Sequence, residues 1–85
     1  MKNVICYDAG DHVADRYTVV FLDQQERMPG LYACLAMSAN PFHPQGFGQH
    51  SNAMVGSHLG KRIAFEKLPP DCQKLVRQDL ANNSP

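Results

Sequence analysis

"RYTVVFL", from Arg16 to Leu22, is the clearest strand in the sequence and decides the fold. Its side chains alternate between two faces, and both faces are largely apolar, with Tyr17, Val19 and Phe21 on one and Thr18, Val20 and Leu22 on the other. A strand that is apolar on both faces is covered from both sides, which is typical of the middle of a sheet. The sequence therefore predicts a sheet with this segment at its centre.

Three further segments have the composition of strands. "NVICY" (residues 3–7) precedes the central segment, and "LYACLAM" (Leu31–Met37) follows it after a connection that contains Pro29 and Gly30. Such a connection links antiparallel strands. In "KRIAFEKL" (residues 61–68), Ile63, Phe65 and Leu68 are expected to point inward, and the first half is an edge strand because charged side chains flank it.

The segment "LPPDCQKLVRQDLANN" (residues 68–83) is the one good helix. A proline fits its first position, and Asp71 favours the positive end of the helix dipole. Its apolar residues form one stripe, made of Cys72, Leu75, Val76 and Leu80. The prediction is an α+β fold over a single domain of residues 1–85. It has a small antiparallel sheet of three to four strands, one C-terminal amphipathic helix packed on one face, and a frayed tail at residues 82–85.

Composition excludes several classes of protein. The 85 residues carry eight basic and eight acidic side chains, which disfavours a nucleic-acid partner and favours self-association. The three cysteines are widely spaced and form no CxxC pair, and no apolar run is long enough for a signal peptide or a membrane span. These features predict a cytoplasmic protein with reduced, buried thiols, no cofactor and no contact with a membrane.

The stretch "NPFHPQGFGQH" (residues 40–50) opens a segment without clear periodicity that continues to Gly60. A structureless loop of that length is uncommon, so either "GQHSNAM" forms a helical turn or the segment is a functional surface loop. Phe42 and Phe47 are expected to anchor it on the sheet. The candidate binding residues are the polar side chains in and after it: His43, Gln45, Gln49, His50, His58, Lys61 and Arg62.

A metal or catalytic site is the competing interpretation. His43, His50 and His58 are candidate metal ligands, but their spacing fits no short zinc motif and no cysteine lies near them. Cys34 and Cys72 lie in apolar contexts that indicate core positions, and no catalytic residue is assigned. An enzyme is therefore disfavoured but left open.

The strings "DRYTVVF", "NPFHPQGFGQH", "HLGKRIAF" and "LPPDCQKLV" resemble a class of short uncharacterised proteins from bacteriophages, plasmids and other mobile or environmental DNA. The resemblance covers Asp15 to Leu80 and implies no reaction. It implies an accessory protein of a mobile element, including an inhibitor of a host factor.

Three functional hypotheses follow, of which the third, nucleic-acid binding through Lys61, Arg62, Lys67, Lys74 and Arg77, is disfavoured by the net charge of zero. The first is a small non-enzymatic binding protein that acts through protein–protein contacts, with another protein or a second copy of itself as the partner. The second is a small ligand-binding or metal-binding protein, with hydrolysis left open, that uses the three histidines of residues 43–58.

Overall fold

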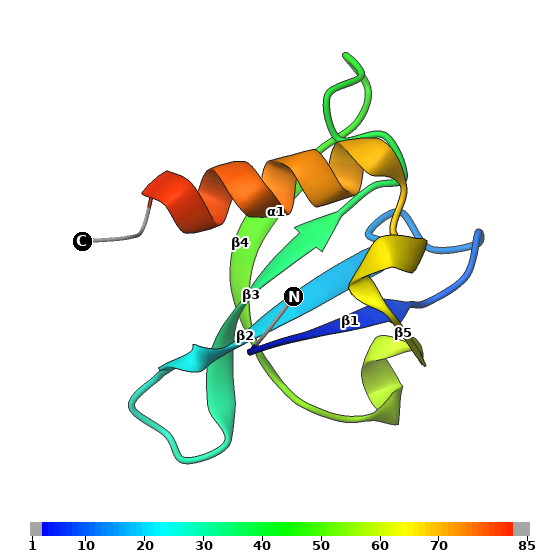
Figure 1. The fold of residues 1–85 in the computed structure, drawn as a ribbon. Coiled ribbons are helices and arrows are strands. Elements are labelled where there is room, and N and C mark those ends of the chain that lie inside the picture. The colour runs from blue at the N-terminus through cyan, green and yellow to red at the C-terminus, as the bar shows by residue number, and fades with distance from the viewer. Residues whose placement is uncertain (1–2, 83–85) are drawn as a thin grey trace.

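A computed structural model describes residues 3–82, which form a five-stranded antiparallel sheet and one helix (Figure 1). The strands are β1 (Val4–Asp8), β2 (Tyr17–Gln25), β3 (Leu31–Met37), β4 (Gly48–Met54) and β5 (Lys61–Ile63). The 3-10 turns η1 (Ser57–Leu59) and η2 (Phe65–Lys67) flank β5, and helix α1 (Pro70–Asn82) follows. The order across the sheet is β4-β3-β2-β1-β5. The predicted α+β class is confirmed, with one strand more than expected.

Strand β2 lies in the middle of the sheet, as its two apolar faces predict. It pairs with β1 on one side and with β3 on the other, so that Val19 lies between Cys6 and Leu35. Val19 and Val20 point to opposite faces, and both are fully buried. The sheet is therefore covered on both sides at its centre.

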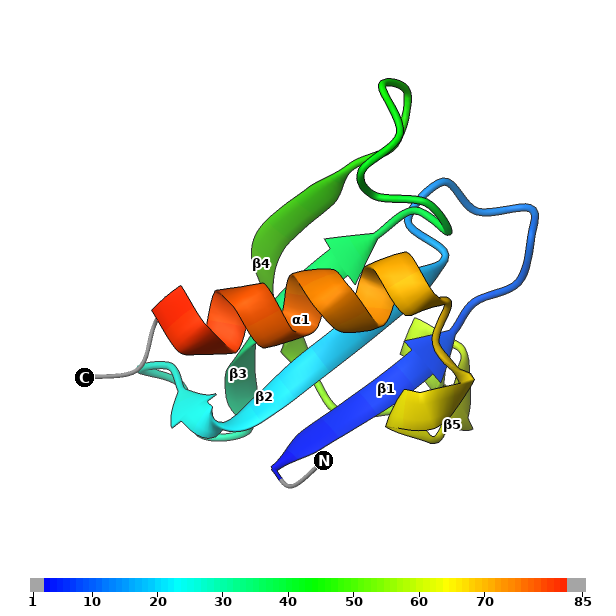
Figure 2. The same cartoon turned by 45° about the horizontal axis from the view of Figure 1, so that its top comes forward.

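Helix α1 covers one face of the sheet, called the helix face below (Figures 1 and 2). Cys72 and Val76 are fully buried there, and Leu75 and Leu80 pack against the same core from partly buried positions. This confirms the predicted stripe. The sheet contributes Cys6, Tyr17, Val19, Phe21, Leu35 and Met37 to this core.

The opposite face, called the second face, is covered by a chain segment instead of a helix. Because β4 and β5 lie at opposite edges of the sheet, residues 55–60 must cross the molecule to join them (Figure 1). Leu59 of this crossing segment packs against a smaller core formed by Tyr7, Val20 and Cys34. The segment thus covers part of the second face.

The segment "GQHSNAM" is strand β4, and neither the helical turn nor the long loop expected from the sequence is present. Its pairing with β3 is regular from Met37 opposite Gly48 to Leu31 opposite Met54. Most of its residues have low strand propensity, but the outer edge of β3 offers a row of backbone partners that fixes the extended conformation. The irregular connection before β4 is therefore confined to residues 38–47, and the strand takes up much of the segment that was expected to be a loop.

The aromatic anchor proposed for this connection is wrong at Phe42. That side chain is 47% exposed, and its ring lies 5.4 Å from the Lys74 ammonium nitrogen on α1. Phe47, directly before β4, is half-buried. The Phe42 ring lies beside α1 and is largely exposed, so it does not anchor the loop on the sheet, and other contacts hold the loop.

Hydrogen bonds at the base hold the loop. The Ser38 N–H donates to the Phe47 carbonyl at 3.0 Å, and the Phe47 N–H donates to Ser38 Oγ at 2.9 Å. The Cys72 thiol donates to the Ser38 carbonyl at 3.3 Å, which ties the loop to the first turn of α1. Gly46 passes so close to the Asn40 carbonyl oxygen that a Cβ atom would overlap it.

Two expectations concern the ends of the chain and membranes. The predicted fraying of residues 82–85 falls mostly outside the described residues, and Asn82 is the last residue of α1. In residues 3–82, no helix has both the length and the apolar character needed to cross a membrane.

The central position of β2 makes a direct stability prediction. Val19→Ala is expected to lower the free energy of unfolding by about 1.5–3 kcal/mol, because it removes two buried methyl groups and leaves a cavity. Val13→Ala is the matched control, since Val13 is 41% exposed, and it should change stability little. Urea denaturation measures both variants. Equal effects of the two substitutions would contradict the placement of β2.

Candidate interaction surface

Strand β4 is the exposed edge of the sheet on the side away from β5. Within residues 3–82, no strand lies beyond it, and every residue of β4 except Ala53 is exposed. An edge strand of this kind offers a row of unpaired N–H and C=O groups to another chain. This outward side of β4 is called the free edge below.

The hydrogen-bond pattern shows which residues serve the free edge. The N–H of Ser38 bonds to the carbonyl of Phe47, so this pair belongs to the bonded class of the β3–β4 ladder. Bonded and non-bonded pairs alternate in antiparallel sheets. Gln49, Ser51 and Ala53 therefore point their backbone groups at β3. The outward groups belong to the residues between them: Gly48, His50, Asn52 and Met54.

The free edge lacks the features by which proteins prevent unwanted strand pairing. Such features include proline, lysine and other charges, bulges and very short strands. β4 has seven residues, and its sequence, GQHSNAM, contains no proline, lysine, arginine, aspartate or glutamate. Its pairing with β3 has no register shift. The free edge is therefore long, regular and open.

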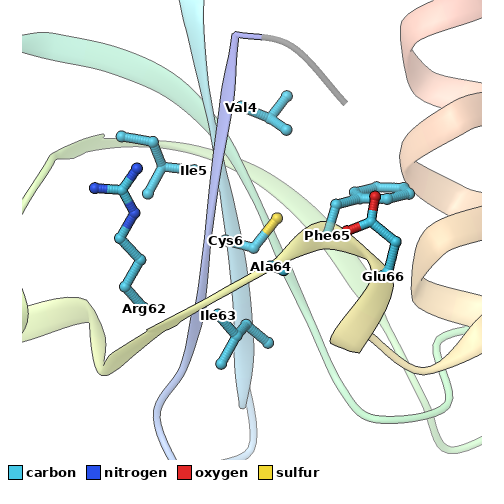
Figure 3. Close-up of a pocket in the computed structure, with 8 residues that line it drawn as sticks. All are labelled: Val4, Ile5, Cys6, Arg62, Ile63, Ala64, Phe65 and Glu66. Atoms are coloured by element: carbon cyan, nitrogen blue, oxygen red, sulfur yellow. The ribbon is translucent and has the colours of Figure 1, made fainter.

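The opposite edge of the sheet, formed by β5, is less suited to pairing with another strand than the free edge is. β5 has three residues, of which Lys61 and Arg62 carry charge, and the chain turns away into η2. A hollow of about 350 Å³ lies at this edge, lined by residues of β1, β5 and η2. Ile5 and Arg62 lie on one side of β1 there, and Phe65 and Glu66 lie on the other side, next to α1 (Figure 3). This edge offers little free backbone.

An ionisable pair, in which the carboxylate is buried and the imidazole is largely exposed, ties β4 to the helix. The Asp79 carboxylate of α1 is 8% exposed, and its Oδ1 bonds to His50 Nε2 on β4. Its Oδ2 is buried and has no hydrogen-bond partner within the described residues. A buried carboxylate is costly unless it is paired, so His50 is the group that makes Asp79 tolerable there. His50 thus has its side chain on the helix face and its backbone on the free edge.

Asp79 was not identified from the sequence, although a signal was present. It follows Cys72 by seven positions and Leu75 by four, which places it on the apolar stripe of the helix. An acidic residue on a stripe that faces a sheet predicts a polar partner on that sheet. The predicted stripe was defined by its apolar residues only, so Asp79 was not included in it.

Apolar side chains lie at both ends of β4 on the helix face. At its first residue, the Leu75 side chain packs so closely on Gly48 that a Cβ atom at that position would overlap it. At its last residue, Met54 is 50% exposed. A side chain is therefore excluded at position 48, whereas Met54 remains half exposed at the other end.

The second face of β4 borders another hollow, of about 310 Å³. It is lined by residues of β3, of β4 and of the connections before β2 and before β4: Ala14, Asp15, Ala36, Phe47, Gln49 and Ser51. Of these, Gln49 and Ser51 are exposed β4 side chains, so this part of the second face is accessible next to the free edge.

The predicted binding residues do not form one surface. His43 and Gln45 lie in the loop, where the Gln45 N–H donates to His43 Nδ1 at 3.1 Å. Gln49 and His50 lie on opposite faces of β4. The other three lie elsewhere: His58 in η1, and Lys61 and Arg62 in β5 at the far edge. Of the predicted set, only Gln49 and His50 belong to β4.

The histidines are likewise not brought together as metal ligands. His43 lies in the loop, His50 faces Asp79, and His58 lies in the crossing segment. Among residues 3–82, no group of three or more histidine, cysteine, aspartate or glutamate side chains is placed to hold a metal ion. The metal interpretation therefore has no geometric support from these residues.

The three cysteines are buried and free, as their apolar contexts predict. Burial raises the pKa of the Cys6 thiol to about 11, with a contribution from the Glu66 charge. Burial also raises the pKa of Cys72 to about 11, with a contribution from Asp71, and it raises the pKa of Cys34. All three thiols are therefore protonated, weak nucleophiles near neutral pH.

The thiol burial has a kinetic consequence. In the native protein, Ellman's reagent at pH 8 is expected to label all three cysteines slowly, and urea should make them all react quickly. The reason is that both access and the thiolate fraction are low in the folded state. Rapid labelling of Cys34 without denaturant would contradict its placement on the second face.

The pair between His50 and Asp79 has an energetic consequence. His50→Ala is expected to lower the free energy of unfolding by about 1–3 kcal/mol, because it leaves the buried Asp79 carboxylate without a partner. Adding Asp79→Leu to His50→Ala should recover part of that loss. Gln49→Ala is the control, since it alters the neighbouring exposed residue on the other face. Urea unfolding in which His50→Ala matches this control would show that the pair contributes nothing.

Comparison of the chain with protein-family models, curated proteins and solved structures finds no match.

Proposed function

We propose that this protein is a small non-enzymatic binding protein that accepts an extended strand of a protein partner at the free edge of β4. Backbone groups of Gly48, His50, Asn52 and Met54 provide the hydrogen bonds of such a contact. Strand addition to an exposed sheet edge is a common way to recognise an extended protein segment. The contact belongs to the protein–protein class favoured by the net charge of zero.

One observation carries the proposal: β4 is a regular seven-residue edge strand without charge or proline, and no strand covers it within residues 3–82. An unguarded edge is a liability for a protein that works alone, because it invites pairing. The edge is also rigidly placed, since β4 pairs with β3 along its whole length and His50 bonds to Asp79. A rigid edge loses little conformational entropy on binding.

The biological setting of this proposal comes from the sequence resemblance. An accessory protein of a mobile element that works in the cytoplasm and inhibits a host factor agrees with buried, free thiols and with a protein-binding function. The alternative of a ligand-binding or hydrolytic protein that uses His43, His50 and His58 has no comparable support, because those histidines form no common site among the described residues.

A proline substitution at Asn52 tests whether the partner binds through backbone hydrogen bonds of β4. The N–H of Asn52 points to the free edge, so Asn52→Pro removes one outward donor and keeps every β3–β4 hydrogen bond. It should weaken binding of a partner captured from source cells, while the protein stays folded by circular dichroism. Asn52→Ala is the matched control, because it removes the same side chain and keeps the N–H, and it should bind like the wild type.

The comparison separates backbone pairing from a side-chain effect. Ser51→Pro is a further control with the opposite expectation, because the Ser51 N–H points at β3 and its loss should damage the fold itself. A captured partner that binds Asn52→Pro as tightly as it binds Asn52→Ala would overturn the proposal.

A further inference from the structure

We infer that the strand that adds to β4 is β4 of a second copy of this chain, in an antiparallel pair with its two-fold axis at Ser51. The inference rests on the proposed function, because it names the partner of the same free edge. The product would be a dimer with one continuous ten-stranded sheet, each copy giving five strands.

The outward backbone groups select this register. Antiparallel hydrogen bonds form only where outward residues of both strands face each other. With the axis at Ser51, Gly48 faces Met54 of the other copy and His50 faces Asn52 of the other copy. All outward N–H and C=O groups of both strands are then paired. Moving the axis by half a residue brings outward residues opposite inward ones, and the ladder is lost.

The neighbouring registers that keep the ladder are worse. An axis at His50 leaves Met54 of each copy without a facing residue in β4 and sets the two His50 side chains opposite each other. An axis at Asn52 leaves Gly48 of each copy without a facing residue. Each alternative therefore loses backbone pairs at the ends. The axis at Ser51 is the only one that uses the whole strand.

Side chains on the helix face fit the same register. Met54, which is 50% exposed, faces Gly48 of the other copy, which has no side chain. Leu75 of that copy covers its Gly48, so Met54 gains an apolar neighbour at the position where a larger residue would collide. In the middle of the strand, His50 faces Asn52, and no charged side chain of β4 opposes another.

Side chains on the second face agree with it as well. Ser51 faces Ser51 across the axis, and Gln49 faces Ala53 of the other copy. Continuing the register one residue beyond β4 places Val55, which is 41% exposed, opposite the half-buried Phe47 of the other copy. The exposed apolar residues at the C-terminal end of β4 in one copy therefore lie next to apolar side chains at the N-terminal end of β4 in the other copy. Such complementarity of a strand with its own reverse is what a two-fold interface requires.

Sedimentation velocity over a range of concentrations tests the dimer. The wild type is expected to reach twice the chain mass of 9.5 kDa as its concentration rises. Asn52→Pro should raise the dimer dissociation constant roughly tenfold or more, because one hydrogen bond is lost at two symmetric places. Asn52→Ala, which keeps the N–H, should dimerise nearly as well as the wild type.

Cysteine cross-linking tests the register without relying on proline. Ser51 faces its own symmetry mate as a non-hydrogen-bonded pair, with a Cα separation of about 4.5 Å that a disulfide can span. Mild oxidation should therefore cross-link Ser51→Cys to itself. Gln49→Cys and Ala53→Cys should each fail alone and cross-link when mixed, because those positions face each other. The native thiols are all buried and provide the background control.

Each outcome decides a different claim. A wild type that stays monomeric at all concentrations overturns the second copy as partner, and the Asn52→Pro comparison with a captured partner then judges strand addition separately. A dimer that Asn52→Pro does not weaken, or that shows no Ser51→Cys cross-link, overturns the proposed interface. If Asn52→Pro does not fold, the cross-linking pattern alone decides the register.

Discussion

The width of a single helix is the constraint on which the rest of this structure depends. A helix with its side chains is about 10–12 Å wide, whereas five strands spaced at about 4.8 Å extend over roughly 19 Å between the outer strands. The only helix in residues 3–82 is fixed over the central strands by Cys72 and Val76, which are fully buried. The outer strands must therefore be stabilised by other means. β5 is short and charged, and β4 is held by the contact of His50 with Asp79 and by Leu75 over Gly48.

These supports explain why β4 is both fixed and open. Its inner side is paired with β3 along the whole strand, and its helix face is tied to α1 at two points. Neither support uses the outward backbone groups. A strand held in this way is already in the conformation that strand addition needs, so the hydrogen bonds of a partner cost little ordering. The same sequence features that make β4 a poor strand former, its polar and small residues, keep it free of the charges that block pairing.

The sequence predicted the parts of the fold that are specified by apolar patterning. "RYTVVFL" and "LYACLAM" are apolar enough to identify β2 and β3, and the bounds of β3, Leu31–Met37, agree with the structure. The helix and its stripe were also predictable from spacing. β4 was missed because "GQHSNAM" has almost no apolar alternation, and its extended form comes from pairing with β3. The free edge and the role of His50 depend on that strand and on Asp79, so neither followed from periodicity alone.

Amide hydrogen exchange along β4 tests the central claim most directly. In dilute solution, the amides of His50, Asn52 and Met54 should exchange quickly, and those of Gln49, Ser51 and Ala53 should exchange slowly, because only the second set bonds to β3. As the protein concentration rises, exchange of the first set of amides should slow. The second set should remain protected throughout. An absence of alternation in dilute protein would show that β4 has no free edge. Alternation that persists unchanged at high concentration would show that a second copy does not occupy it.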